Sequence, residues 1–472
     1  MRDFNVRTMW GAVAAGLMLA AAVFVAFRGR FDYAFDLIDI PAVSLAVGLA
    51  LAGLLVLPLP WLIWRSQDMA PDGARWLLLS ITVVGLVVRS VLFVTEPALE
   101  DDYNRYLWDG GVTVHGLNPY ALAPATALEQ GEETAIGRLA LSADVVMERI
   151  NHPDLKTIYP PVTQAAFALA HILKPWSLGA WRLVCLVGEV ATLALLLMLL
   201  ADARRSPLWV SLYWWNPLII KEMINSAHME AILMPLVLAA LLLAARKRMV
   251  PATVMLGLAA GAKLWPILLA PLLLRPLLDR PRMLIVYTAL LGVLLAAWAL
   301  PPLLGGIDET SGFVAFASFW QTNSALFPAV AKLVDVVLAT LRLPVENAGL
   351  IARLGLGLTV AAVAVWVALR PWTTTADLMQ KAGLVASALF LLSPAQFPWY
   401  AAWMMPFLVF RPSLALLGLT ALLPIYYASF HFLAREQYDT FRYGLVWLIW
   451  LPVWAGLAIE WWVSKRKATT DA

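Results

Sequence analysis

Residues Thr8 to Phe27 read TMWGAVAAGLMLAAAVFVAF, a run of apolar and small side chains without a single charge. A helix that crosses the hydrocarbon core of a bilayer needs about 20 such residues, so this run is long enough to span. Arg2 and Arg7 precede it, as basic residues precede the apolar core of a signal peptide. Because the run is long and further apolar runs follow, we expect a first transmembrane helix that is not cleaved.

The composition of the whole chain agrees with this interpretation. Of the 472 residues, 62% are hydrophobic and only 14% are charged, whereas soluble domains carry about 25% charged residues. A net charge of +3 gives no basic face for nucleic acid. The single cysteine, Cys185, excludes disulfides and a multi-thiolate metal site. The 22 tryptophans are typical of a protein with belts at two membrane interfaces.

Apolar segments recur to the end of the chain and predict an all-α polytopic membrane protein of about 11–14 transmembrane helices. After residues 8–27 they fall near 41–64, 76–94, 181–201, 207–221, 226–245, 251–274, 283–301, 326–341, 348–369, 382–410, 413–430 and 444–463. We divide the chain into N-terminal helices (1–75), a central module that includes the long polar segment 95–160 (76–275) and C-terminal helices (276–472).

The short loops between these segments predict the orientation. Basic residues cluster at 204–205, 246–248, 275–282, 370 and 465–467, and such clusters mark the cytoplasmic side. With the N-terminus inside, three crossings place the long polar segment 95–160 outside. Its apolar stretch 135–147 predicts short helices and hence an ordered loop.

Three consecutive carboxylates, Glu100, Asp101 and Asp102, open this loop directly after a spanning helix. Like charges at the edge of a low-dielectric region raise the pKa of at least one of them. A carboxylate in this position is a candidate general base, and the alternative is a solvated acidic cap at a helix end.

The surrounding strings are EDDYNRYLWDGGVTVHGLNPY (100–120), INHPDLKTIYPPVTQ (150–164), WNPLIIKEMINSAHMEAIL (215–233), GAKLWPILLAP (261–271) and SPAQFPWYAAWMMP (393–406). In this order they resemble the GT-C glycosyltransferases, in particular the bacterial polyprenyl-phosphate-mannose-dependent mannosyltransferases. The resemblance implies a GT-C-like bundle. It covers about residues 76 to 410.

The resemblance also implies the reaction. A hexose, by default mannose, moves from a polyprenyl-phosphate donor to a glycan or lipid acceptor on the periplasmic or outer face of the cytoplasmic (inner) membrane. Asp101 or Asp102 is implied as the base of an inverting transfer. The alignment slightly favours Asp101, and Asp102 would then orient the acceptor. The remaining residues assigned to substrate binding are Glu100, Arg105, Tyr106, Asp109, Tyr159 and Glu230.

The leaving phosphate needs cations or hydrogen-bond donors around it. The candidates are Lys156, His152, Lys221, His228 and Lys263, with snorkelling to an interface as the alternative for the membrane lysines. Arg105 is also expected to pair with the acidic cluster, and Arg89 to be structural. The aromatic residues of 396–403 are expected to belong to an interfacial belt more than to a sugar site.

No spacing of carboxylates and histidines is diagnostic of a metal, so the sequence predicts neither a metal nor another cofactor. The expected partners are the lipid-linked donor, the acceptor and membrane lipids, without nucleic acid. A glycolipid transporter or flippase and an inactive assembly subunit are the alternatives. A transporter would place its charges near the midplane between repeated halves, whereas these charges follow the end of one helix.

Overall fold

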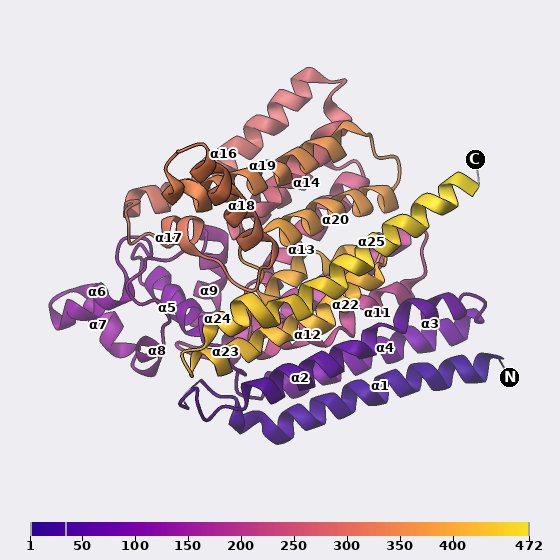
Figure 1. Ribbon diagram of the computed structural model, residues 1–472, viewed down its shortest axis with the longest axis horizontal. Coiled ribbons are helices and arrows are strands. Elements are labelled where there is room, and N and C mark those ends of the chain that lie inside the picture. Colours follow the sequence, from indigo (N-terminus) through magenta and orange to yellow (C-terminus); the bar gives the residue numbers. More distant parts are fainter. Residues whose placement is uncertain (1, 34, 471–472) are drawn as a thin grey trace.

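The computed structural model describes residues 2–33 and 35–470, and its regular elements are helices (Figure 1). They are α1 (Arg2–Phe27), α2 (Ala42–Gly53), α3 (Leu59–Arg65), α4 (Pro71–Phe93), α5 (Asp102–Val114), α6 (Pro124–Glu129), α7 (Ala135–Ser142), α8 (Val145–Glu148), α9 (Pro161–Leu173), α10 (Leu178–Asp202), α11 (Ser211–Trp214), α12 (Pro217–Ile220), α13 (Glu230–Ala245), α14 (Met249–Ala262), α15 (Ala270–Leu274), α16 (Pro281–Gly305), α17 (Gly312–Phe319), α18 (Leu326–Thr340), α19 (Ala348–Leu369), α20 (Thr375–Leu392), α21 (Met405–Leu408), α22 (Leu414–Leu422), α23 (Ala428–Leu433), α24 (Tyr438–Thr440) and α25 (Val446–Thr470). A π-helical turn, η5 (Lys221–Asn225), and a 3₁₀ turn, η9 (Pro398–Trp403), complete the parts that build the site.

Within residues 2–33 and 35–470, nine helices are long and apolar enough to cross a membrane. The segments Pro217–Asn225 and Glu230–Ala245 pass this test only as a pair, bend by 116° between them, and raise the number to ten if counted as one span. Three further apolar helices, Pro161–Leu173, Met249–Ala262 and Trp265–Leu277, are shorter. At 1.5 Å per residue they do not cross about 30 Å of hydrocarbon alone. The predicted polytopic all-α fold is confirmed. Nine or ten spans within the described residues are fewer than the 11–14 predicted, because several apolar segments form short or broken helices.

The two ends of the bundle differ in what they carry. In Figure 1 both termini lie at one end, whereas α5–α8 lie at the opposite end. Three of the long helices precede the loop, as the sequence predicts. Arg246 Nε donates to Asp202 Oδ2 (2.7 Å) and so joins the ends of α10 and α13. Helix α10 has 25 residues, about 37 Å at 1.5 Å per residue, so the basic loop at 246–248 lies that far from the start of α10, which follows α9.

Helices α4, α10 and α11 are joined by a buried ion pair. Arg89 Nη2 lies 2.8 Å from Glu189 Oε2, and both side chains have no exposed surface. Tyr213 OH donates to the other carboxylate oxygen of Glu189 (2.5 Å). A Cβ at Gly85 would lie 2.2 Å from Trp214 Nε1, so only glycine allows this approach of α4 and α11. The structural role expected for Arg89 is confirmed.

The 95–160 loop is ordered, as predicted, and α7 and α8 form within its apolar stretch. Helix α5 packs against α9, where a Cβ on Gly110 would lie 2.4 Å from the Phe167 carbonyl oxygen. Pro161 occupies the first turn of α9, a position where proline is favoured because its missing N–H has no helical partner. The Tyr-Pro-Pro sequence thus begins this helix.

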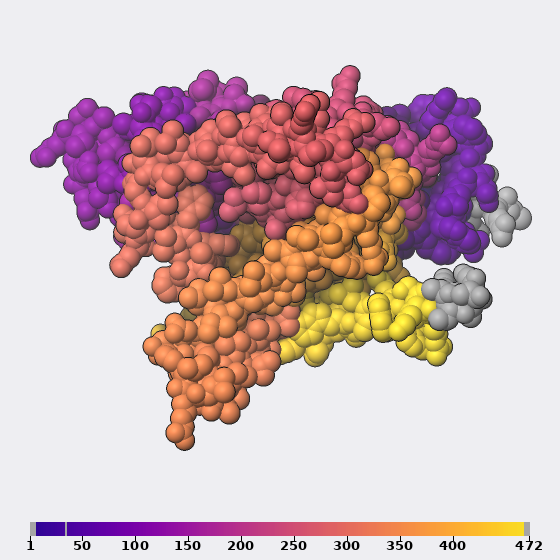
Figure 2. Space-filling model, turned by 90° about the horizontal axis from the view of Figure 1, so that it is seen from above, coloured from indigo at the N-terminus to yellow at the C-terminus, as the bar shows by residue number. Residues whose placement is uncertain are grey.

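One hairpin stands apart from the rest. The α18–α19 turn projects from the body of the molecule in the space-filling view, where it is orange (Figure 2). Leu341, Leu354 and Leu358 are exposed on this hairpin. Their apolar surface is suited to contact with lipid, because a bilayer imposes no cost on exposed hydrocarbon.

Candidate active site

The acidic loop is fastened to the break between η5 and α13. The Asn225 side chain accepts from the Ala98 N–H (2.9 Å) and donates to Thr95 Oγ1 (2.9 Å) and the Glu96 carbonyl (2.8 Å). Arg182 Nη1 donates to the Thr95 carbonyl (2.7 Å). Two buried side chains from distant helices therefore fix the backbone that leads into the three carboxylates.

The three carboxylates do not point the same way. Glu100 is buried and turns toward the imidazole of His228, with 3.3 Å between Oε2 and Nε2. Asp101 and Asp102 are joined by one amide, because Asn151 Nδ2 donates to an oxygen of each, at 2.9 and 2.7 Å. The two NH₂ hydrogens of asparagine suffice for this bridge. The amide thereby holds the aspartates side by side.

The environment of the two aspartates raises the pKa of both carboxyl groups. Burial, and then the charges of Asp102 and Glu100, raise the pKa of Asp101 to about 8. Burial and the Glu100 charge raise the pKa of Asp102 to about 6, against the opposing effect of His228. The sequence-based prediction that at least one of these carboxyls has a raised pKa is confirmed.

A cavity of about 600 Å³ opens beside these aspartates. It brings together most of the residues predicted for the site, namely Glu100, Asp101, Asp102, Arg105, Tyr106, His152, Lys156, Tyr159, Glu230 and Lys263. Tyr106 is stacked on Phe167 with ring centroids 4.7 Å apart, and its hydroxyl lies 3.5 Å from Asp102 Oδ2. One wall of the cavity is therefore polar and strongly charged.

Three predicted residues lie behind this wall and do not line the cavity: Asp109, Lys221 and His228. Lys221 is buried and donates to the Tyr427 hydroxyl. His228 is stacked on Trp399 with 4.0 Å between ring centroids.

Asp109 organises the adjacent loop. It accepts from Arg105 Nε (3.0 Å), from the Thr157 hydroxyl and from Gln164 Nε2 (3.0 Å). The expected pairing of Arg105 with the acidic cluster is thus wrong. Asp109 lies four residues further along the same helix, where an ion pair forms readily. Arg105 Nη2 donates to the Leu155 carbonyl (2.9 Å). This hydrogen bond holds the part of the loop that precedes the Tyr-Pro-Pro sequence.

The two cavity lysines have different partners. Lys156 Nζ lies 2.6 Å from Asp308 Oδ2 and donates to the carbonyls of Gly305 and Gly306 (3.4 Å each). Lys263 Nζ lies 2.5 Å from Glu230 Oε1 and over the Tyr400 ring, 4.0 Å from its centroid. An ammonium has three N–H donors. Lys156 therefore has an acceptor for each donor, whereas Lys263 has one hydrogen-bonded partner among residues 2–33 and 35–470.

The remaining donor-site candidate, His152, lies on the exposed part of the loop. Its ring meets Trp320 edge to face, with 4.8 Å between centroids. Trp320 comes from the end of α17, so this contact joins the 95–160 loop to the C-terminal segment of the chain.

The aromatic wall of the cavity corrects one expectation. Phe397, Trp399, Tyr400 and Trp403 line the cavity and do not form a lipid-facing belt. Pro398 starts the 3₁₀ turn η9, which folds these rings inward. Pro398, within this short aromatic string, was the available signal.

The sequence patterns also do not identify Asn151 as a site residue, although it lies within the string 150–164. Nothing in its local sequence indicates that it bridges two carboxylates 49 and 50 residues away.

A membrane bundle that holds a charged and aromatic cavity at one end has the architecture of a GT-C-type glycosyltransferase. Residues 8–277, more than half of the chain, match the family model described as alpha-(1->6)-mannopyranosyltransferase, N-terminal domain. The chain belongs to this family and is a mannosyltransferase. Comparison with curated proteins and with solved structures gives no significant match.

Proposed function

We propose that this mannosyltransferase takes its sugar from a polyprenyl-phosphate donor and transfers it to a hydroxyl of a glycan or lipid acceptor. The observation that carries the proposal is the mixed lining of the cavity. Carboxylates and lysines line it together with aromatic rings, and Lys263 Nζ lies 4.0 Å from the centroid of the Tyr400 ring. A lipid-linked sugar phosphate has the matching chemistry, with a polar sugar and phosphate joined to a long hydrocarbon chain.

Asp101 is the base in this proposal. Both aspartates line the cavity, but Asp102 is also close to Tyr106 OH (3.5 Å) and His228 Nδ1 (3.9 Å). Within the described part of the chain, the side-chain hydrogen bond that Asp101 accepts comes from Asn151. Once ionised, above its pKa of about 8, Asp101 therefore retains more free acceptor capacity for the proton of an acceptor hydroxyl. Asp102 orients the acceptor.

Lys263 is the donor-phosphate residue that the contacts favour. Its ammonium keeps donors free beside Glu230, whereas those of Lys156 are engaged by Asp308 and two carbonyls. A cation at this point offsets the charge that develops on the leaving phosphate. In this proposal, Lys156 and His152 hold the part of the 95–160 loop that lines the cavity.

Direct attack of the acceptor oxygen on the anomeric carbon inverts its configuration, as in one-step inverting glycosidases. The new C–O bond forms as the bond to the phosphate oxygen breaks, and the acceptor proton passes to Asp101. If the product linkage is alpha, as the family description states, an inverting transfer requires a beta-linked donor.

The reaction faces the outside of the cytoplasmic membrane in this proposal. Helix α25 carries the basic residues 465–467 at the end of the bundle where the termini lie, and α5–α8 lie at the other end (Figure 1). Short basic loops stay in the cytoplasm. The cavity beside α5 would then open to the periplasm or cell exterior.

The test is transfer by the purified chain in proteoliposomes that contain radiolabelled polyprenyl-phosphate mannose and a membrane extract as acceptor. We expect a labelled, alkali-stable product with this donor and none with GDP-mannose. Transfer from GDP-mannose alone would overturn the proposal, as would failure of the lipid-linked donor to support any transfer.

A further inference from the structure

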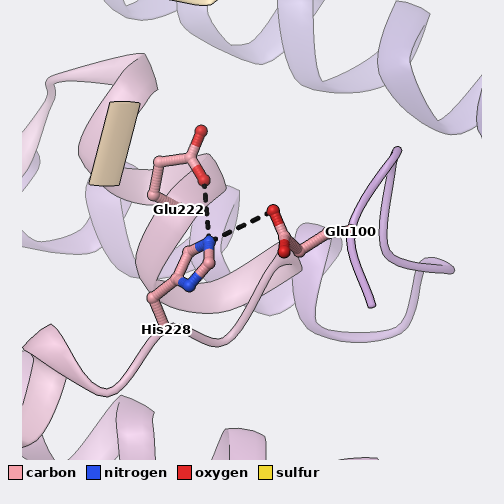
Figure 3. A group of neighbouring side chains, drawn as sticks. All are labelled: Glu100, Glu222 and His228. Carbon is pink, nitrogen blue, oxygen red and sulfur yellow. Dashed lines mark ion pairs between the residues drawn. The ribbon is translucent and has the colours of Figure 1, made fainter. Parts of the chain in front are cut away.

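Glu100, Glu222 and His228 converge on one point behind the cavity wall, and they come from the acidic loop, from η5 and from the break before α13 (Figure 3). His228 Nε2 lies 3.3 Å from Glu100 Oε2 and 3.4 Å from Glu222 Oε2. All three residues are buried. The imidazole nitrogen points between the two carboxylates, as the dashed lines of Figure 3 show.

Hydrogen bonding alone does not account for this arrangement. A ring nitrogen carries at most one hydrogen, which cannot point at two carboxylates at once. Nε2 of His228 makes no hydrogen bond of normal geometry to any described residue. Ligands bound tetrahedrally at about 2.0–2.1 Å lie about 3.3–3.4 Å apart. Both nitrogen-to-oxygen distances fall in this range, and the ligand atoms of the three residues all lie within 4.8 Å of one another.

The surroundings resemble the outer shell of a metal site. A ligating histidine commonly directs its other ring nitrogen at a carboxylate or hydroxyl, which fixes the tautomer. His228 Nδ1 lies 3.4 Å from Tyr106 OH and 3.9 Å from Asp102 Oδ2. Glu222 is oriented in turn, because Tyr427 OH donates to its other oxygen, Oε1 (2.8 Å). Each of these two ligands therefore has a second partner that holds it, and Lys221 Nζ also lies 3.4 Å from Glu222 Oε2, the oxygen that faces His228.

We propose that Glu100, Glu222 and His228 bind a divalent cation, and that Zn²⁺ fits best. Two carboxylates and one imidazole are ligands that Zn²⁺ accepts, and three protein ligands leave a fourth position for water or substrate. Calcium would require six to eight oxygen ligands. Because Glu100 also lines the cavity, the ion lies at the cavity wall.

The position of the ion suggests what it does, and this step rests on the proposed function. The donor phosphate enters the same cavity, and its oxygen can take the fourth position. A metal ion there would stabilise the charge of the leaving phosphate as a Lewis acid. In the alternative without metal, a protonated imidazole bridges the two carboxylates. The purified protein would then contain no metal ion at this site.

The test measures metal in the full-length chain, purified without chelators through a tag that contains no histidine. Mass spectrometry of the metals should find about one zinc ion per chain, and ZnCl₂ added after EDTA treatment should rebind and raise the melting temperature. A Zn²⁺ titration should show at least about 10-fold weaker binding in Glu222→Gln and in Glu100→Gln. Glu100 lies on a loop, so the second variant is the less disruptive to folding.

The control is His171→Asn, which removes a buried histidine of α9 outside the cluster and should leave zinc binding unchanged. Wild-type protein without zinc and without Zn²⁺ binding would overturn the proposal, and so would full zinc binding in both glutamate variants. These measurements use no sugar donor. Zinc binding without transfer from polyprenyl-phosphate mannose would therefore refute the proposed function and leave the metal site standing.

Discussion

Replacement of Asp101 by asparagine is the most direct test of the chemistry. The change keeps the size of the side chain and its Oδ1 acceptor, so the hydrogen bond from Asn151 (2.9 Å in the native protein) can remain. What disappears is the capacity to take the acceptor proton. General-base catalysis contributes about 10²–10⁴-fold, which corresponds to about 2.7–5.4 kcal/mol of transition-state stabilisation at 1.36 kcal/mol per tenfold.

The assay is initial-rate mannosyl transfer in proteoliposomes, with donor concentration varied to separate kcat from KM. We expect Asp101→Asn to lower kcat by this factor and to change the KM for the donor less than about threefold, because the lost interaction belongs to the transition state. Asp154→Asn is the matched control, since Asp154 is an exposed carboxylate of the same loop. It should retain wild-type kinetics.

Two results would refute the reasoning. Wild-type kcat in Asp101→Asn, with the lipid-linked donor, would exclude this carboxylate as the base. A greater loss of kcat in Asp102→Asn than in Asp101→Asn would transfer the role to Asp102, whose contacts with Tyr106 and His228 we interpret as positioning.

Three further predictions concern the phosphate site, the topology and the core. Lys263→Met should raise the donor KM about 10–100-fold through loss of a charge-assisted hydrogen bond, and a larger effect of Lys156→Met would contradict the assignment. Glu129→Cys should react with an impermeant maleimide in cells with only the outer membrane permeabilised, and Asp279→Cys only after lysis; the reverse pattern would invert the topology. Arg89→Met should lower the free energy of unfolding by about 3–5 kcal/mol by leaving its buried glutamate unpaired, measured by denaturant titration in detergent, and native-like stability would count against that pair.

Local sequence was sufficient for much of the fold. A spanning helix is encoded by the hydropathy of about 20 consecutive residues, so Thr8–Phe27 alone predicted α1. The number of apolar segments and the positions of the basic residues predicted that the acidic loop and the basic loops lie on opposite sides of the membrane. The raised pKa in the Glu100–Asp102 triplet was predicted from adjacent like charges at the edge of a low-dielectric region, although burial, which the tertiary structure decides, is the larger cause. The Arg105–Asp109 pair was also within reach, because its spacing of four is a helical neighbour relation.

The composition of the cavity was decided by tertiary structure. Asn151 bridges Asp101 and Asp102 from the far end of the loop, and Glu222 reaches the same histidine as Glu100. The aromatic wall comes from η9, near residue 400, because a proline-initiated turn points its rings inward. The hydropathy of a segment predicts that it is buried in lipid or protein, but it does not predict which face of the helix packs against which neighbour. The packing depends on how broken helices such as η5 and α13 are arranged. This arrangement brings residues that are distant in sequence together around one site.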